Sequence, residues 1–95
     1  MGQSKVLVVG FRGYEVLKTT ATSAGFTELN FANLNYAERL FIQTTNDVVV
    51  KFDHITGDEL TIKTTTGLDF HKKCAKLWVK AVSTNAVFEV CGFKD

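Results

Sequence analysis

The stretch Lys76-Leu77-Trp78-Val79-Lys80 carries the pattern that decides the fold. Apolar residues alternate along it with lysines and one tryptophan, and successive side chains of a β-strand point to opposite faces of the sheet. A strand that buries Leu77 and Val79 must therefore turn Trp78 outward, between the two lysines. The pattern predicts a half-buried strand whose outward side carries the largest apolar side chain of the protein.

Short alternating runs of this kind recur through most of the chain, at residues 39–44, 48–53, 60–65, 74–82 and 86–93. Residues 46–47 are interpreted as a tight turn between two antiparallel partners, and residues 83–85 as a hairpin connection. The small and polar residues 19–25 and 66–69 indicate loops or turns. Short strands at close spacing, with no amphipathic helix, predict an all-β domain built as a β-sandwich or small barrel, with its β core at residues 37–93.

The N-terminal part carries two further apolar runs, at residues 5–9 and 14–17, separated by Gly10-Phe11-Arg12-Gly13. The two glycines suit a turn or bulge, so residues 1–18 are predicted to form an arm or a β-hairpin. A nucleotide-binding turn also has glycines after a strand. The central glycine of that motif and an acidic residue for a ribose are missing here, which favours the simple turn.

Composition restricts the class of protein. A chain of 95 residues forms one domain, 1–95, and its 45% apolar and 22% charged residues are globular values. The formal net charge of +1 supplies no overall field, which disfavours nucleic acid and anionic membranes as partners. No apolar run approaches the ~20 residues of a spanning helix, and the N-terminus lacks a signal-peptide pattern, so we expect synthesis in the cytoplasm and no membrane contact.

Cys74 and Cys91 are too few and too widely spaced for a disulfide framework or a Cys-x-x-Cys metal site. Free thiols are the favoured interpretation, and a bridge between neighbouring strands is the alternative.

Candidate catalytic and metal-binding groups are sparse. Asp53, Asp58 and Glu59 crowd one connection and could offer oxygen ligands to Ca²⁺, but their spacing is unlike an EF-hand loop and favours solvated loop charge. His54 and His71 lie near no serine or cysteine in a nucleophile motif. We therefore predict no catalytic, metal-binding or cofactor-binding residue, and no enzymatic activity.

Charged residues near Trp78 leave two interpretations open. An aromatic residue surrounded by lysines is typical of a surface that binds single-stranded nucleic acid. The small net charge instead favours a solvated or subunit-facing strand, on which lysines discourage edge-to-edge aggregation. Residues 47–59 carry four acidic residues and one lysine, whereas residues 71–80 carry four lysines and no acid, a division that suits head-to-tail self-association.

Other strands also carry apolar residues on the side opposite their core positions. Several such residues on adjoining strands form a surface of the kind that marks an interface, unless both faces are buried within the sandwich. We predict one outward apolar face for contact with other subunits, made of Phe41, Val49, Trp78, Val87 and Phe93.

A resemblance to a known class of proteins rests on four segments with this alternating pattern: Ala37-Glu38-Arg39-Leu40-Phe41-Ile42-Gln43-Thr44, Asp47-Val48-Val49-Val50-Lys51-Phe52, Ala75-Lys76-Leu77-Trp78-Val79-Lys80-Ala81 and Asn85-Ala86-Val87-Phe88-Glu89-Val90. Together with the polar strand at residues 58–62, they resemble a class of small virion structural proteins of tailed bacteriophages. The resemblance covers about residues 37–93. Trp78 and Lys80 depart from the small residues expected at their positions.

The resemblance implies a jelly-roll-like antiparallel β-sandwich that decorates or cements the capsid. It further implies a homotrimer on the capsid surface of the virion, bound to the major capsid protein after synthesis in the bacterial host cytoplasm. Lys5 and Arg12 would belong to an arm that contacts a neighbour or the shell. A head-fibre or tail-appendage component is the alternative, and a module for single-stranded nucleic acid, or for carbohydrate stacked on Trp78, is a further one.

Overall fold

The computed structural model describes residues 13–95. The predicted interface residues Lys5 and Arg12 lie outside the described residues, as does the first part of the predicted arm or hairpin. The described part of the chain forms the strands β1 (Gly13–Ala21), β2 (Thr27–Asn30), β3 (Arg39–Thr44), β4 (Val48–Phe52), β5 (Leu60–Ile62), β6 (Thr65–Phe70), β7 (Lys76–Ala81) and β8 (Ala86–Lys94).

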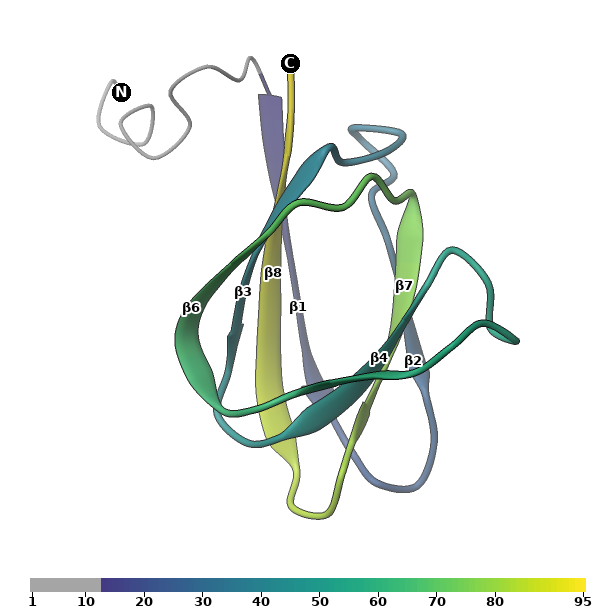
Figure 1. Ribbon diagram of the computed structural model, residues 1–95, viewed down its shortest axis with the longest axis vertical. Coiled ribbons are helices and arrows are strands. Elements are labelled where there is room, and N and C mark those ends of the chain that lie inside the picture. Colours follow the sequence, from purple (N-terminus) through teal and green to yellow (C-terminus); the bar gives the residue numbers. More distant parts are fainter. Residues whose placement is uncertain (1–12) are drawn as a thin grey trace.

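These strands form two four-stranded antiparallel sheets, in the orders β1-β8-β3-β6 and β2-β7-β4-β5. We call them the first and the second sheet; they lie on the left and on the right of Figure 1. The pairing is nested, because β1 pairs with β8, β2 with β7, β3 with β6, and β4 with β5. One long antiparallel ribbon is thus rolled up, and the β3–β8 and β4–β7 pairs close it into a sandwich. This order is the jelly roll, so the predicted antiparallel, jelly-roll-like β-sandwich is confirmed.

Strands that follow one another closely in sequence lie in opposite sheets. The connection at residues 45–47 leads from β3 to β4, and that at residues 82–85 leads from β7 to β8, without either pair sharing a ladder. The hairpins predicted at residues 46–47 and 83–85 are therefore wrong. Both connections cross between the sheets, as the β7–β8 connection at the bottom of Figure 1 shows.

Two predicted loops also contain strand. Residues 19–21 continue β1 along β8, so only the end of the predicted loop at 19–25 forms a turn. The predicted turn at residues 66–69 lies inside β6, which pairs with β3. Its weak local signal is overridden by packing, because the ring of Phe41 lies over Gly67 and a Cβ there would sit 2.6 Å from Phe41 Cζ.

The core fills the space between the inner faces of the two sheets. Along β8 the buried residues alternate with outward ones, as the sequence predicts for a strand with one buried face. The largest side chains that are almost completely buried are those of Phe31, Phe88, Leu40, Ile42, Leu77, Val48, Val50, Val79, Val90 and Cys74. Phe31 lies outside the strands and packs against Gly92, where a Cβ would sit 2.6 Å from Phe31 Cε1.

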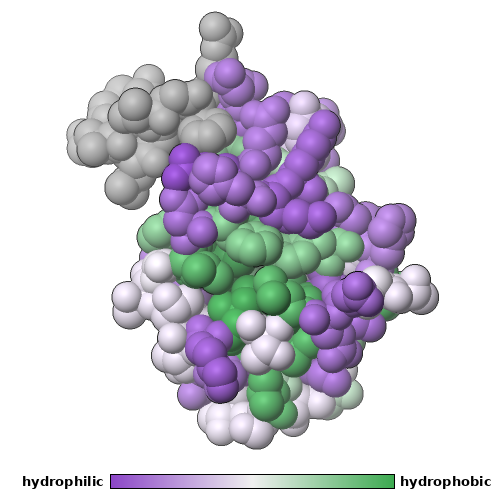
Figure 2. Space-filling view, in the orientation of Figure 1, coloured by the Kyte–Doolittle hydropathy of each residue, from purple (hydrophilic) through white to green (hydrophobic). Residues whose placement is uncertain are grey.

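The sheets also meet along the side that carries β6 and β4. The rings of Phe52 and Phe70 stack across this seam with their centroids 5.5 Å apart, so one residue from each sheet closes the gap. Figure 2 shows apolar surface in the middle of this view, between the areas where β6 and β4 lie in Figure 1, with polar side chains around it.

Candidate interaction surfaces

The predicted site residues divide between the two outer faces of the sandwich. Phe41, Val87 and Phe93 lie on strands of the first sheet, and Val49 and Trp78 lie on strands of the second. The prediction that all five share one outward face is therefore wrong. It failed because the chain passes from one sheet to the other between β3 and β4 and again between β7 and β8.

An apolar row crosses the outer face of the first sheet. Val16 on β1 lies opposite Cys91 on β8, and Cys91 lies opposite Phe41 on β3. Tyr14, two residues from Val16 on the same side of β1, lies opposite Phe93. We define the apolar row as Tyr14, Val16, Phe41, Cys91 and Phe93. Exposure within it is substantial, at 47% for Tyr14, 47% for Val16 and 38% for Phe41.

Two of the predicted interface residues do not contribute as expected. Phe93 has the predicted outward register, but it is only 8% exposed, so its ring does not form open surface. Val87 is 41% exposed but stands apart from the apolar row, because Glu89 lies between it and Cys91 on the outward side of β8. The open part of the row is therefore centred on Val16 and Phe41.

An ion pair borders the apolar row next to Phe41. Arg39 Nε donates to Asp69 Oδ1 at 2.8 Å, and Arg39 Nη2 donates to Asp69 Oδ2, a bidentate arrangement between β3 and β6. The hydrogen bond from Arg39 lowers the pKa of Asp69, and the same bond raises the pKa of Arg39. The pair places charge at the rim of an apolar surface, as is common at protein interfaces.

Both cysteines are free, which confirms the favoured interpretation. Burial, with a smaller contribution from Asp53, raises the pKa of Cys74 to about 12. Burial and the charge of Glu89 raise the pKa of Cys91 to about 11. Because the thiolate is the nucleophilic form, these thiols are poor nucleophiles near neutral pH. Cys91 therefore acts as a small apolar side chain within the row.

The outer face of the second sheet carries aromatic rings covered by lysines. Lys51 Nζ lies 4.8 Å and Lys80 Nζ lies 4.9 Å from the ring centroid of Phe26. On β7, Lys76 Nζ lies 5.8 Å from the ring centroid of Trp78. We call these residues, Phe26, Lys51, Lys76, Trp78 and Lys80, the basic aromatic face. The predicted sharing of one side of β7 by Trp78 and its two lysines is confirmed, although all three side chains are half-buried.

Sequence reasoning missed Phe26 and Lys51 as members of this face. Lys51 on β4 lies opposite Trp78 in the ladder, and Phe26 directly precedes β2, which pairs with β7 on its other side. Both residues are distant from Trp78 in sequence, and only strand pairing brings them together. The sequence predicted a strand at residues 48–53 but did not identify its neighbouring strand in the sheet.

One carboxylate accompanies the lysines of the basic aromatic face. Glu28 lies opposite Trp78, with its Oε2 3.7 Å from Lys76 Nζ, and it also accepts a hydrogen bond from Asn30 Nδ2 at 2.9 Å. Lys51 Nζ donates to the carbonyl of Ile55 at 2.8 Å, which fixes its position beside Phe26. The face is thus positive, with three lysines and one glutamate.

The acidic and basic segments do not form separate complementary patches. β4, within the acidic segment, pairs directly with β7, within the basic one. Asp53 Oδ1 accepts a hydrogen bond from the backbone N–H of Ala75 at 2.8 Å. Asp47 accepts one from the N–H of Thr64 at 2.9 Å, and this bond lowers its pKa. The two segments therefore lie side by side in one sheet, and head-to-tail association stays a prediction.

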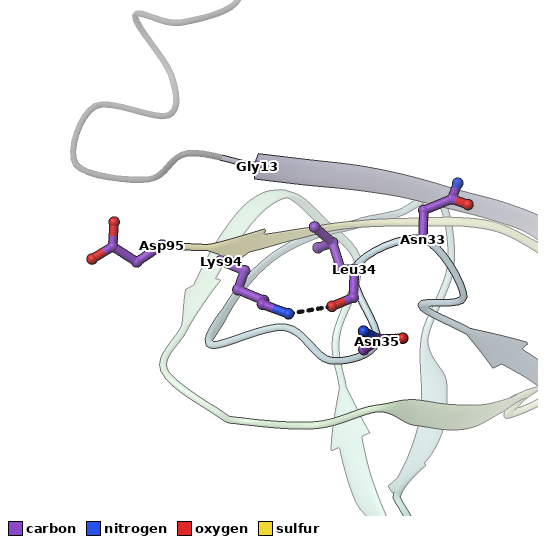
Figure 3. A pocket seen from close by; sticks show the side chains of 6 residues that line it. All are labelled: Gly13, Asn33, Leu34, Asn35, Lys94 and Asp95. Carbon is purple, nitrogen blue, oxygen red and sulfur yellow. Dashed lines mark hydrogen bonds between the residues drawn. The ribbon is translucent and has the colours of Figure 1, made fainter.

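A shallow pocket of about 250 Å³ lies where β1 begins and β8 ends (Figure 3), lined by Gly13, Asn33, Leu34, Asn35, Lys94 and Asp95. Lys94 Nζ donates to the carbonyl of Leu34 at 2.6 Å and lies 4.2 Å from the ring centroid of Tyr36. Glu15 Oε1 accepts hydrogen bonds from the backbone N–H groups of Asn33 and Leu34. The charged groups at this end therefore hold the connection between β2 and β3.

Other candidate chemistry is limited to scattered residues. Between residues 13 and 95, no group of three or more His, Cys, Asp or Glu side chains is placed to hold a metal ion. His54 and His71 are both exposed. No helix of the described chain is long and apolar enough to span a membrane.

Comparison with known proteins gives no relative: no protein-family model matches the sequence, and no curated protein matches it. The two outer faces are therefore the basis for a functional proposal.

Proposed function

We propose that this chain is a non-enzymatic virion structural protein that self-associates and binds the outer surface of a bacteriophage capsid, stabilising it. The jelly-roll fold and the apolar row support the proposal, in addition to the resemblance over residues 37–93. The jelly roll is a recurrent architecture of viral capsid proteins, although lectins and cupins share it. Because a fold alone does not define a function, the proposal rests mainly on the chemistry of the protein surface.

The apolar row is the main structural support for the proposed self-association. The core between the sheets is complete without this row, since Phe88, Val90, Leu40 and Ile42 fill the inner side of β8 and β3. Val16 and Phe41 nevertheless expose 47% and 38% of their surface, and they lie on either side of Cys91 in the same sheet. Contiguous exposed apolar residues with a charged rim mark protein–protein contacts.

A homotrimer is the assembly that the resemblance favours. In it, the apolar row of each copy packs against a neighbouring copy, which removes Val16 and Phe41 from water. Lys5 and Arg12 are proposed to contact the major capsid protein.

Solution mass tests the self-association. Light scattering coupled to gel filtration is expected to give the mass of a trimer for the wild type. Val16→Glu, which places a charge in the apolar row, is expected to give a monomer that still melts cooperatively. Ile55→Glu is the matched control, because Ile55 is 45% exposed on the loop after β4, away from the row. A wild-type protein that stays monomeric at all concentrations would remove the support for this interface.

Cosedimentation tests the capsid contact. If the reading frame next to this chain in its source genome encodes a major capsid protein, empty capsids are prepared from that protein. The wild type is expected to sediment with them to saturation and to raise the temperature at which they disassemble. If the protein stays in the supernatant while intact virions contain it in fibres or tails, the capsid role fails and the appendage role replaces it.

A further inference from the structure

We propose that the basic aromatic face binds single-stranded nucleic acid. The apolar row and the basic aromatic face lie on opposite sides of the sandwich, so this proposal does not depend on the proposed capsid contact. The two surfaces could serve the protein at the same time.

Geometry is the first support. Lys76, Trp78 and Lys80 share one side of β7, and the two lysines are separated by about 13 Å along the strand. Lys51 on β4 lies beside Trp78 and extends toward Phe26, which also lies close to Lys80. The result is two aromatic rings with three ammonium groups around them on one side of a sheet.

The chemistry of the face fits phosphates together with bases. Single-stranded nucleic acid is bound by cations that follow the backbone and by aromatic rings on which bases stack. Here the ammonium groups lie over the rings of Phe26 and Trp78. A phosphate that draws an ammonium group toward itself would uncover a ring face for a base. An acidic protein segment would use the charges but leave the rings without a partner, so the rings favour nucleic acid.

The small net charge of +1 is a sum over the whole chain and does not describe the local charge of this face. Three lysines gather on it, and Glu28 already lies beside Lys76. Contact with three phosphates corresponds to a slope of about −2 in a plot of log affinity against log salt concentration. Binding is therefore expected to be measurable at low salt and to weaken as salt is added.

Trp78 is the single tryptophan of the chain and reports directly on the face. The full-length protein is titrated with an oligothymidylate of about 20 nucleotides, which is long enough for at least one binding site of a small β module. We expect quenching of the tryptophan fluorescence and a salt slope of about −2. Binding of a fluorescein-labelled oligonucleotide, followed by anisotropy, supplies a second readout that does not need Trp78.

Matched variants locate the site. Lys80→Gln is expected to make the salt slope shallower by about 0.7, the value of one phosphate contact on a single strand. Lys18→Gln is the control, because Lys18 is exposed on the outward side of the first sheet, and its slope is expected to equal that of the wild type. Trp78→Leu is expected to weaken binding about tenfold or more through loss of base stacking. Thermal melting verifies that each variant is folded.

Three outcomes would overturn the proposal. The first is the absence of binding at low salt. The second is equal binding of polyglutamate, a polyanion without bases, with the same Trp78 quenching, which would assign the face to an acidic protein partner. The third is an equal loss of slope in Lys18→Gln and Lys80→Gln, which would show that binding has no defined location. The Lys80→Gln measurement keeps the test decisive even if Trp78→Leu does not fold.

Discussion

The two sheets are both four-stranded and antiparallel, but their outer faces differ in chemistry. On the first sheet, the ring of Phe41 lies over Gly67 and is 38% exposed, with the Arg39–Asp69 pair beside it. On the second sheet, the rings of Phe26 and Trp78 are covered by lysine side chains. One face thus offers apolar surface to a partner, whereas the other offers positive charge above its apolar surface.

The outward residues can differ between the two faces because the inward residues stabilise the fold. Every strand in a sandwich commits alternate residues to the core, and burial of those residues supplies most of the driving force for folding. The outward residues contribute less to stability, so two faces of one small domain can acquire unlike chemistry. We expect the two faces to bind partners of different kinds.

The largest expected effect is a difference in stability loss between substitutions on the inner and the outer side of the first sheet. Phe88→Ala, at an inward position that is 0% exposed, is expected to lower the free energy of unfolding by about 3–5 kcal/mol. Phe41→Ala, on the outward side of the neighbouring strand, is expected to cost about 1 kcal/mol or less. Urea unfolding in the Val16→Glu background, which is expected to be monomeric, measures both without a contribution from subunit contacts. Equal losses would mean that Phe41 belongs to the core and that the apolar row is not spare surface.

A smaller effect is expected from the two glycines at which aromatic rings approach the backbone. A Cβ at Gly92 would sit 2.6 Å from Phe31 Cε1 and 2.8 Å from Ala37 Cβ, atoms that have no room to move within the core. Gly92→Ala is expected to cost about 1–3 kcal/mol by overpacking.

Gly67→Ala is the matched comparison on the outer face of the first sheet. The added Cβ would meet only the far end of the Phe41 ring, which can turn toward solvent. We expect a change in stability of about 0.5 kcal/mol or less, with altered self-association because the ring leaves its place in the apolar row. Thermal unfolding and light scattering on both alanine variants test this. A larger stability loss for Gly67→Ala than for Gly92→Ala would contradict the assignment of inner and outer sides.

The smallest expected effect concerns the loss of stability in acid that comes from the Arg39–Asp69 pair of the first sheet. The hydrogen bond from Arg39 lowers the pKa of Asp69 in the folded protein relative to the unfolded chain. A lowered carboxyl pKa contributes stability that is present above the unfolded value of about 4 and is lost as the pH falls through the folded value. Asp69→Asn is therefore expected to reduce the acid sensitivity of stability below pH ~4.

Urea midpoints measured from pH 7 downward check this expectation. Asp58→Asn serves as the control, since Asp58 is an exposed residue of the loop between β4 and β5. The residual acid sensitivity of Asp69→Asn is expected to include Asp47, whose pKa is lowered mainly by its hydrogen bond from the Thr64 N–H. If Asp69→Asn and the wild type lose stability equally in acid, the ion pair does not stabilise the folded protein.

Several features of the fold followed from local sequence. The bounds predicted for β3, at residues 39–44, agree with the structure. The inward assignment of Leu77 and Val79 is also confirmed, since each is 0% exposed. These predictions succeeded because alternation is a property of neighbouring residues and needs no knowledge of the partner strand.

The candidate surfaces were only partly predictable. Trp78 was correctly placed between two lysines, but Phe26 and Lys51 join it through the pairing of β7 with β2 and β4. Phe41 and Trp78 were assigned to one face, although they lie on different sheets. Short connections such as residues 45–47 look alike in sequence whether they join strands of one ladder or cross between sheets.

Alternation along the chain was enough to establish an all-β domain and the buried side of most strands, because side-chain alternation is local and the hydrophobic effect acts on each strand separately. The strand order, the division into two sheets, the strand character of residues 66–69 and the composition of each outer face depend on tertiary pairing. The physical reason is that ladder hydrogen bonds join residues far apart in the chain, as when Gly13 pairs with Lys94, and the residues next in sequence do not encode such partners.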